Sequence, residues 1–429
     1  MDYGRTFFHN RTLDSDDTIG EGKTKMVART KTQTQTWSRV EDRPFRYDYV
    51  LLASVILLTL LGIVTLSSAS HLFALSRPAR FADGFTPIKS NMYACLIMIV
   101  LFPVIMFSKM KLLRDGRFVF ALIAFTILLN LLPFMSAFQR GGGDQGLVVR
   151  RWIIVRFGGG SISFQPSEVI KVVLPIYLAF ILDKNTHKIG NFFYGPLPPA
   201  IVTAAFAALA YFQDNYSEVV LISVVGIVVC FIAGIRYGWF VVSGGIVGGF
   251  LYMVTFGNPE GRWYRRISTF LNPGQDRFGA TFQTDMSTEA IRSGGFIGTG
   301  IGQGTMKTRI PEVHGDFVFA SFAEETGLLG VFMHLALIAV FAGVVFYVVW
   351  RGRNRFHRLL AFGLVTPIVL QTLMNVAVVA NVIPTTGVAL PFVSSGGSSL
   401  LMTLWASALL VNVTRRHALS LDREVPDAG

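Results

Sequence analysis

A short acidic stretch beside a long apolar run carries the clearest chemical signal in this sequence. The stretch PEVHGDFVFASFAEETG (residues 311–327) contains His314, Asp316, Glu324 and Glu325 and leads into the apolar run. Ionisable side chains at or inside the edge of a bilayer are costly, and those that occur there usually serve a function. A carboxylate at an apolar mouth is a stronger base near neutral pH than one in water. Asp316 is therefore a candidate general base.

Each of these residues also has a structural interpretation. Asp is a preferred N-cap residue, so Asp316 equally fits the start of a helix. Glu324 and Glu325 follow two or three helical turns later. They would bind a cation, pair with an arginine or tune Asp316, or they would form a buried structural pair. His314 fits substrate binding or a loop hydrogen bond, and one histidine is weak evidence for a metal.

Composition places these residues in a membrane protein. Hydrophobic residues make up 52% of the chain and charged residues 15%, whereas a soluble domain has about 25% charged residues. Apolar runs long enough to cross a bilayer as helices recur along the sequence. We expect ten spans, at residues 49–70, 91–108, 117–135, 167–182, 199–213, 217–235, 238–256, 325–350, 359–383 and 397–414. The prediction is an all-α polytopic membrane protein with a large outer-face loop between helices 7 and 8.

The distribution of basic residues predicts the orientation. Lys and Arg collect in alternate loops, and with ten spans all of these loops lie on one side, which the positive-inside rule makes cytoplasmic. Both termini are then cytoplasmic. No nucleic-acid motif accompanies the net charge of +12, so we expect no nucleic-acid partner. Cys95 and Cys230 lie within predicted spans and form no metal-binding or disulfide pattern.

Three segments divide the chain. Residues 1–46 are polar, lack the apolar core of a signal peptide and predict a disordered cytoplasmic tail. This tail would dock partners or serve as a tether. Residues 47–416 form the transmembrane domain, and residues 417–429 a cytoplasmic C-terminal tail.

Three long loops rich in Gly, Pro and polar residues share the predicted outer face. They are residues 136–166, 257–316 and 384–397. Long irregular loops in a compact protein are usually functional. The outer face is therefore the predicted working face, and Asp316 lies at the end of its longest loop.

The loop at 136–166 and the helix after it contain candidate binding residues. Arg151 would hold a diphosphate through two hydrogen bonds, and Trp152 offers an amphipathic ring at the membrane boundary. The alternative is a solvated arginine beside an aromatic-belt tryptophan. Glu168 and Lys171 lie one turn apart, so they would contact substrate or form an intramembrane ion pair.

The other two loops supply further candidates. Outer-face cations run against the positive-inside trend and suit an anionic ligand; they are Arg265, Arg266, Arg277, Arg292 and Lys307. Of these we select Arg292, with Gln283 as a substrate or loop-shaping residue. Ser394, Ser395 and Gly396 would offer N–H groups to an anion at the start of the last span, or they would cap and pack that helix.

Five motifs resemble the SEDS family, the FtsW/RodA/SpoVE polymerases. They are RRWI followed by FQPSE and Lys171, RISTFLNPGQDRFGATFQ (266–283), SGGFIGTGIGQG (293–304), PEVHGDFVFASFAEETG, and PTTGVALPFVSSGGSSL (384–400). They occur in family order at family-like spacing, over roughly residues 45–416.

The resemblance implies a peptidoglycan glycosyltransferase that polymerises lipid II into β-1,4 glycan strands outside the cytoplasmic membrane. It implies inversion at the anomeric carbon, a class b penicillin-binding protein as transpeptidase partner, and other divisome proteins as partners. The family's essential acid corresponds to Asp316. Divalent cations such as Mg²⁺ or Mn²⁺ commonly organise diphosphate leaving groups, but no ligand cluster in the sequence identifies one.

The chain departs from the family pattern at three positions. Asn215, or Asp214 with a one-residue slip, stands where the family commonly has Asp, so a carboxylate role there is in doubt. Gly315 replaces Thr, and Met286 replaces Gln.

The stretch TDMSTEAIRSGGFIGTGIGQGTMK is more similar to FtsW, the division branch, and predicts enrichment at the septum. The alternatives are the elongation (RodA-type) polymerase, a lipid II flippase and a non-catalytic division scaffold.

Overall fold

The computed structural model describes residues 46–76, 86–135, 151–157, 160–257, 261–272, 280–310 and 313–422. The predicted N-terminal tail therefore lies outside the described residues except for Arg46, as does the C-terminal tail beyond Asp422. Arg277 and the first half of the predicted loop 136–166 also lie outside them. Residues Arg46–His417 form one compact unit.

Ten helices of this unit occupy the ten predicted spans. They are α2 (Tyr47–Ser76), α3 (Thr86–Phe107), α4 (Gly116–Leu131), α5 (Ser167–Lys184), α6 (Leu197–Phe212), α7 (Tyr216–Ile232), α8 (Tyr237–Phe256), α11 (Val318–Arg351), α12 (Arg355–Val379) and α13 (Gly397–Asp422). Six of the described helices, α2, α3, α4, α11, α12 and α13, are long and apolar enough to cross a membrane. Three shorter apolar helices, within α6, α7 and α8, accompany them. The predicted polytopic helical fold is confirmed.

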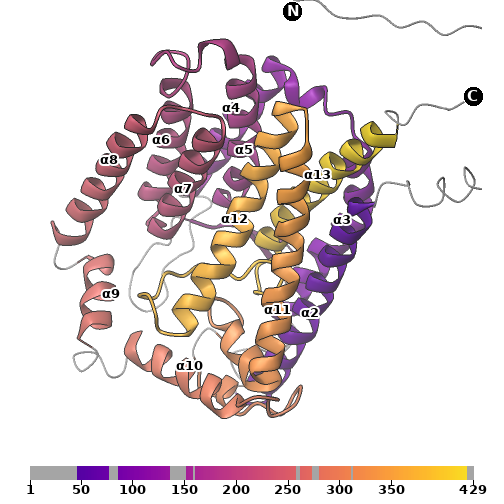
Figure 1. The fold of residues 1–429 in the computed structure, drawn as a ribbon. Coiled ribbons are helices and arrows are strands. Elements are labelled where there is room, and N and C mark those ends of the chain that lie inside the picture. The colour runs from indigo at the N-terminus through magenta and orange to yellow at the C-terminus, as the bar shows by residue number, and fades with distance from the viewer. Residues whose placement is uncertain are drawn as a thin grey trace, which may run out of the picture. The chain divides into compact units, whose positions relative to one another are not determined.

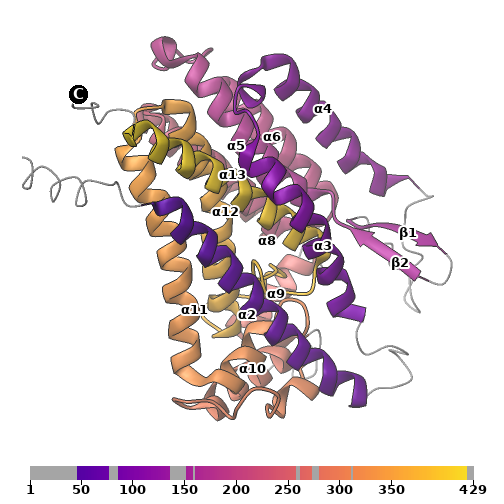
Figure 2. The same ribbon diagram turned by 90° about the vertical axis from the view of Figure 1, so that its right-hand side faces the viewer.

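Two predicted loops contain regular structure. Between α8 and α11 lie α9 (Arg262–Leu271), α10 (Ala280–Gly294) and the 3₁₀ turn η6 (Met306–Thr308). The loop before α5 contains an antiparallel hairpin of β1 (Ile153–Phe157) and β2 (Gly160–Phe164), with Ile153 opposite Phe164 (Figure 2). Short 3₁₀ turns at Leu112–Arg114, Leu132–Phe134 and Thr186–Lys188 complete the described elements.

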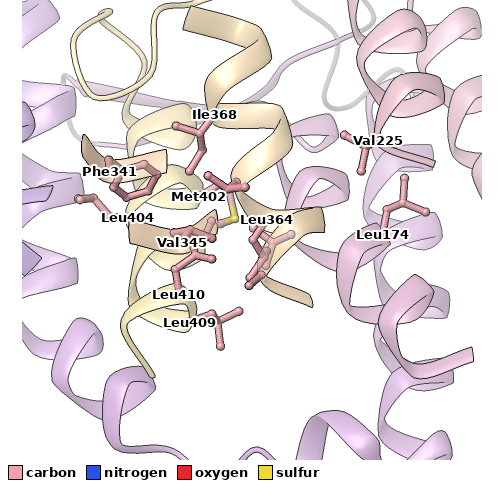
Figure 3. Close-up of a cluster of buried hydrophobic side chains, with 14 of the residues drawn as sticks. Leu174, Val225, Phe341, Val345, Leu364, Ile368, Met402, Leu404, Leu409 and Leu410 are labelled. Carbon is pink, nitrogen blue, oxygen red and sulfur yellow. The ribbon is translucent and has the colours of Figure 1, made fainter. Parts of the chain in front are cut away.

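The core forms where α12 packs against α5, α7 and α11, and α13 contributes side chains to the same cluster (Figure 1). Apolar side chains from all five helices meet there (Figure 3); they include Leu174, Val225, Phe341, Val345, Leu364, Ile368, Met402 and Leu410. Gly363 of α12 allows a close approach to α5, because a β-carbon there would lie 2.7 Å from Pro175. Small residues commonly let membrane helices approach in this way.

The loop between α12 and α13 is held against α2. Gly62 of α2 lies so close to this loop that a β-carbon would meet the Phe392 carbonyl oxygen at 2.1 Å. Phe392 itself has a φ of +66°, a conformation that non-glycine residues rarely adopt. The loop is therefore fixed by its backbone. In Figure 1, α9 and α10 lie toward one end of the helix bundle.

Candidate active site

The turn that carries Asp316 is clamped to the loop between α12 and α13. The Asn375 side chain of α12 donates to the carbonyl oxygens of Asp316 and Val388, at 2.8 Å each. The Ser394 hydroxyl donates to the Gly315 carbonyl at 2.8 Å. The Ser395 N–H donates to the His314 carbonyl at 2.8 Å. Backbone groups on both sides of Asp316 are thus bound, which fixes its position.

The N-cap interpretation of Asp316 is wrong. Helix α11 begins at Val318, and its N-cap is Phe317, with no side-chain hydrogen bond at the cap. The Asp316 side chain instead lies near Gly387. A β-carbon on Gly387 would stand 3.4 Å from the Asp316 carboxylate and 3.9 Å from Nη1 of Arg266.

Arg266 places its guanidinium beside the same glycine. It lies in α9, and its guanidinium donates to the Thr385 carbonyl at 3.1 Å. Gly387 has a φ of +74° and no side chain, which leaves room between the two charged groups. Both side chains are half-buried. A carboxylate and a guanidinium thus lie on the two sides of Gly387.

A buried charged cluster joins α5 and α7. The Lys171 ammonium lies 2.7 Å from the Glu168 carboxylate and 3.8 Å from that of Glu218 in α7. All three are buried. The residue preceding Glu218, Ser217, donates from its hydroxyl to the carbonyl oxygen of Thr386, the neighbour of Gly387. The predicted ion pair of Glu168 and Lys171 is therefore present, and the cluster is coupled to the Asp316 site through α7.

Sequence reasoning missed Glu218. It stands in YSEVVLISVV, at the start of an apolar helix. The rule that selected Asp316, an ionisable group within an apolar run, also applies to Glu218. Asn215, at the family's Asp position, is buried and lies 3.5 Å from the Ser167 hydroxyl. A carboxylate is therefore present near this position, one turn further along the chain.

The side chains of Glu324 and Glu325 are bound by residues 305–307, which follow the glycine-rich segment. The Glu324 carboxylate accepts from the N–H groups of Thr305 at 2.6 Å and Met306 at 3.0 Å. Glu325 forms an ion pair with Lys307, and both are buried. This arrangement favours structural roles for the two glutamates over substrate contact. Lys307 is not an exposed outer-loop cation, because its charge is used inside the protein.

The four N–H groups from Ser394 to Gly397 all donate within the protein. Their acceptors are the Leu390 and His314 carbonyls, the Asn91 side chain and the Ser90 hydroxyl. The packing alternative for Ser394, Ser395 and Gly396 fits these bonds better than anion binding. Burial lowers the pKa of His314 to about 4, so its imidazole is neutral at pH 7 and brings no charge to the site.

The remaining predicted residues lie on three elements. Arg151 and Trp152 are half-buried immediately before β1. Gln283 is half-buried in the first turn of α10, and Arg292 is exposed in its last turn. Within the described ranges, no three His, Cys, Asp or Glu side chains cluster as a metal site would require. The divalent cation stays a prediction.

An apolar groove of about 740 Å³ runs between α6, α7 and α8. Aromatic rings connect it to the charged site. Tyr211, which lines the groove, contacts Tyr216 with ring centroids 5.5 Å apart. Tyr216 in turn contacts Trp263 of α9 at 5.8 Å. Helix α9 also carries Arg266.

Comparisons with known proteins agree over nearly the whole chain. The sequence model of the FTSW_RODA_SPOVE family, described as "Cell cycle protein", matches residues 48–419. A relative from Geobacter metallireducens, named "Probable peptidoglycan glycosyltransferase FtsW", is 35% identical over 378 residues, which cover 86% of this chain and 95% of that protein. "Stage V sporulation protein E" of Bacillus subtilis is 31% identical over 379 residues, 86% of this chain and 97% of that protein.

Solved structures share the fold. A chain of the structure described as "Structural coordination of polymerization and crosslinking by a peptidoglycan synthase complex" aligns with a TM-score of 0.68 at 23% identity, covering 87% of this chain and 99% of that one. The rod shape determining protein RodA of Thermus thermophilus aligns with a TM-score of 0.56 at 22% identity, covering 87% and 98%.

Proposed function

The chain belongs to the FtsW/RodA/SpoVE family, and we propose that it is a peptidoglycan glycosyltransferase that polymerises lipid II. The observation that carries the proposal is that the Asp316 carboxylate and the Arg266 guanidinium both lie beside Gly387. The names of its relatives support the same activity. The reaction requires a base and a group that stabilises a departing diphosphate, and these two side chains supply one of each.

The proposed step is an inverting displacement. A sugar hydroxyl attacks the anomeric carbon of the donor sugar, the bond from that carbon to the diphosphate oxygen breaks, and the hydroxyl proton passes to Asp316. The transition state has oxocarbenium character, as in glycoside hydrolysis. Arg266 would bind the diphosphate oxygens, whose charge grows as the bond breaks. Lys171 is held by two glutamates, so the buried cluster would hold the site in place.

The groove between α6, α7 and α8 suits the polyprenyl chain of the substrate. Its lining is almost entirely apolar, and α8 stands away from the bundle with four glycines that no other residue approaches; these are Gly244, Gly245, Gly248 and Gly249. The aromatic contacts from Tyr211 to Trp263 lead from the groove to the helix of Arg266. A lipid tail in the groove would place its diphosphate at the charged site.

Charge distribution supports an outward-facing site. The loops on the opposite side of the bundle carry clustered Lys and Arg, whereas residues 212–217 and 384–396 carry none. The positive-inside rule then places both termini in the cytoplasm and Asp316 outside. We propose a class b penicillin-binding protein as partner and the division septum as the place of action.

The competing function is lipid II transport, and reconstitution in vesicles separates the two. Purified protein and its penicillin-binding partner are placed in vesicles with fluorescent lipid II in both leaflets. We expect glycan strands to form and the protected inner-leaflet label to remain inaccessible to an external quencher. Quenching of the inner label without glycan would identify a flippase. Neither activity, with division lost on deletion of the N-terminal tail, would identify a scaffold.

Gly387→Ala is expected to lower polymerisation. Its β-carbon would occupy the space beside the two charged groups, in van der Waals contact 3.4 Å from the Asp316 carboxylate and 3.9 Å from Arg266, and substrate displaced by about 1 Å can react about 100-fold more slowly. Initial rates of glycan formation measure the effect. Gly302→Ala is the matched control, because Gly302 has a similar φ of +85° but no neighbour within 4 Å. Equal losses in the two variants would mean that backbone strain, and not crowding of the site, is responsible.

A further inference from the structure

Helix α11 is broken at Gly327, which separates the segment Val318–Thr326 from the rest. Gly327 has φ 65° and ψ −167°, outside the helical region. Because the helix is interrupted, two of its backbone carbonyls accept hydrogen bonds from the glycine-rich segment. The N–H groups of Thr299 and Gly300 donate to the carbonyls of Glu324 and Glu325, at 3.0 Å each. The segment Val318–Thr326 thus has Asp316 near one end and two glutamates at the other.

The side chains of this far end bind three elements together. The Lys307 ammonium pairs with Glu325 and donates to the Ser68 hydroxyl of α2 at 2.9 Å. Ser68 also donates to Glu325 at 2.5 Å. Lys307 is fully buried and Glu325 is 4% exposed. We call Ser68, Lys307 and Glu325 the buried lock.

The lock cannot act on the reacting atoms directly. Asp316 and Glu325 are nine residues apart, which corresponds to about 13 Å along a helix. Its effect must therefore pass through the segment Val318–Thr326. At the other end, Asn375 and Ser394 hold the turn that carries Asp316. The segment is fixed from both sides.

We propose that Lys307 and Glu325 are positioning residues, which set the place of Asp316 by holding the segment Val318–Thr326 against α2 and the glycine-rich loop. This inference rests on the proposed transferase function. A buried charge without its partner destabilises a protein, whereas replacement of both charges is often tolerated. Stability and positioning can therefore be separated by comparing single and double variants.

The experiment measures kcat, KM for lipid II and thermal unfolding of the purified complex with the penicillin-binding partner. Lys307→Met leaves Glu325 unpaired and is expected to lower both stability and kcat. The double variant Lys307→Met/Glu325→Gln is expected to unfold near the wild-type temperature. The kcat of the double variant is expected to be at least about tenfold below that of the wild type, with KM unchanged. The reason is that the segment Val318–Thr326 is no longer held in its place. Glu289→Gln, the same amide change on an exposed position of α10, is the control.

Wild-type kcat in the stable double variant would overturn the proposal and leave the lock a stability device. If the single variant does not fold, the kcat of the double variant still tests whether the two residues position Asp316. The failure of the proposed function looks different: the wild-type complex itself would then form no glycan.

Discussion

Asp316→Asn is expected to reduce glycan polymerisation by about 10²–10⁴-fold, the usual contribution of a general base. Asparagine has the same shape as aspartate but does not accept the proton of the attacking hydroxyl. The hydrogen bonds that fix the turn use the backbone carbonyls of Asp316 and Gly315, so the variant retains them. The loss should therefore appear in kcat, measured with the purified complex and saturating lipid II.

Asp285→Asn is the matched control for this substitution. Asp285 is exposed on α10, so the same chemical change there should leave the rate unaltered. Both variants should bind the penicillin-binding partner as the wild type does. A normal rate for Asp316→Asn would show that another group is the base, and Glu218, the second carboxylate of the buried cluster, would be the next residue to change.

Arg266→Gln is expected to lower kcat by about 10²–10³-fold, since the removal of one donor to a developing anion typically costs that much. Arg266→Lys should recover part of the rate, because lysine keeps the charge but not the two-pronged geometry. The same steady-state assay with varied lipid II separates loss of turnover from loss of binding.

Arg292→Gln removes the same charge at a position that sequence reasoning selected. Arg292 is exposed at the end of α10, and Gly294 beside it packs on the backbone of Ala323 and Glu324, the far end of the segment from Asp316. We expect a near-normal rate. A larger loss for Arg292→Gln than for Arg266→Gln would place the diphosphate on α10 and contradict the proposed site.

The helices could be predicted from the sequence because each is a separate apolar run. The main error in position is at α11, which begins at Val318 and not near residue 325. Hydropathy falls at Glu324 and Glu325, but the helix continues through them, because the N–H groups of Thr305 and Met306 and the Lys307 ammonium compensate the buried charges. These partners lie in another segment and leave no local signal.

The hairpin and the site partners were missed for a similar reason. Strand β1 pairs with β2 inside a glycine-rich loop, and a two-stranded hairpin is too short for a clear periodic signal. Asp316 itself was found from local sequence. Arg266 is held near Asp316 by the loop between α12 and α13. The carbonyl of Thr385 in this loop, 119 residues after Arg266, accepts the hydrogen bond from the guanidinium. Sequence order alone gives no measure of such a contact.

The most direct test of the account compares wild type and Asp316→Asn in one assay. Each protein is purified with its penicillin-binding partner and given lipid II, and the products are separated by length before and after digestion with a muramidase. We expect muramidase-sensitive glycan strands from the wild type and unreacted lipid II from Asp316→Asn. Strands of equal yield from both proteins would contradict this expectation.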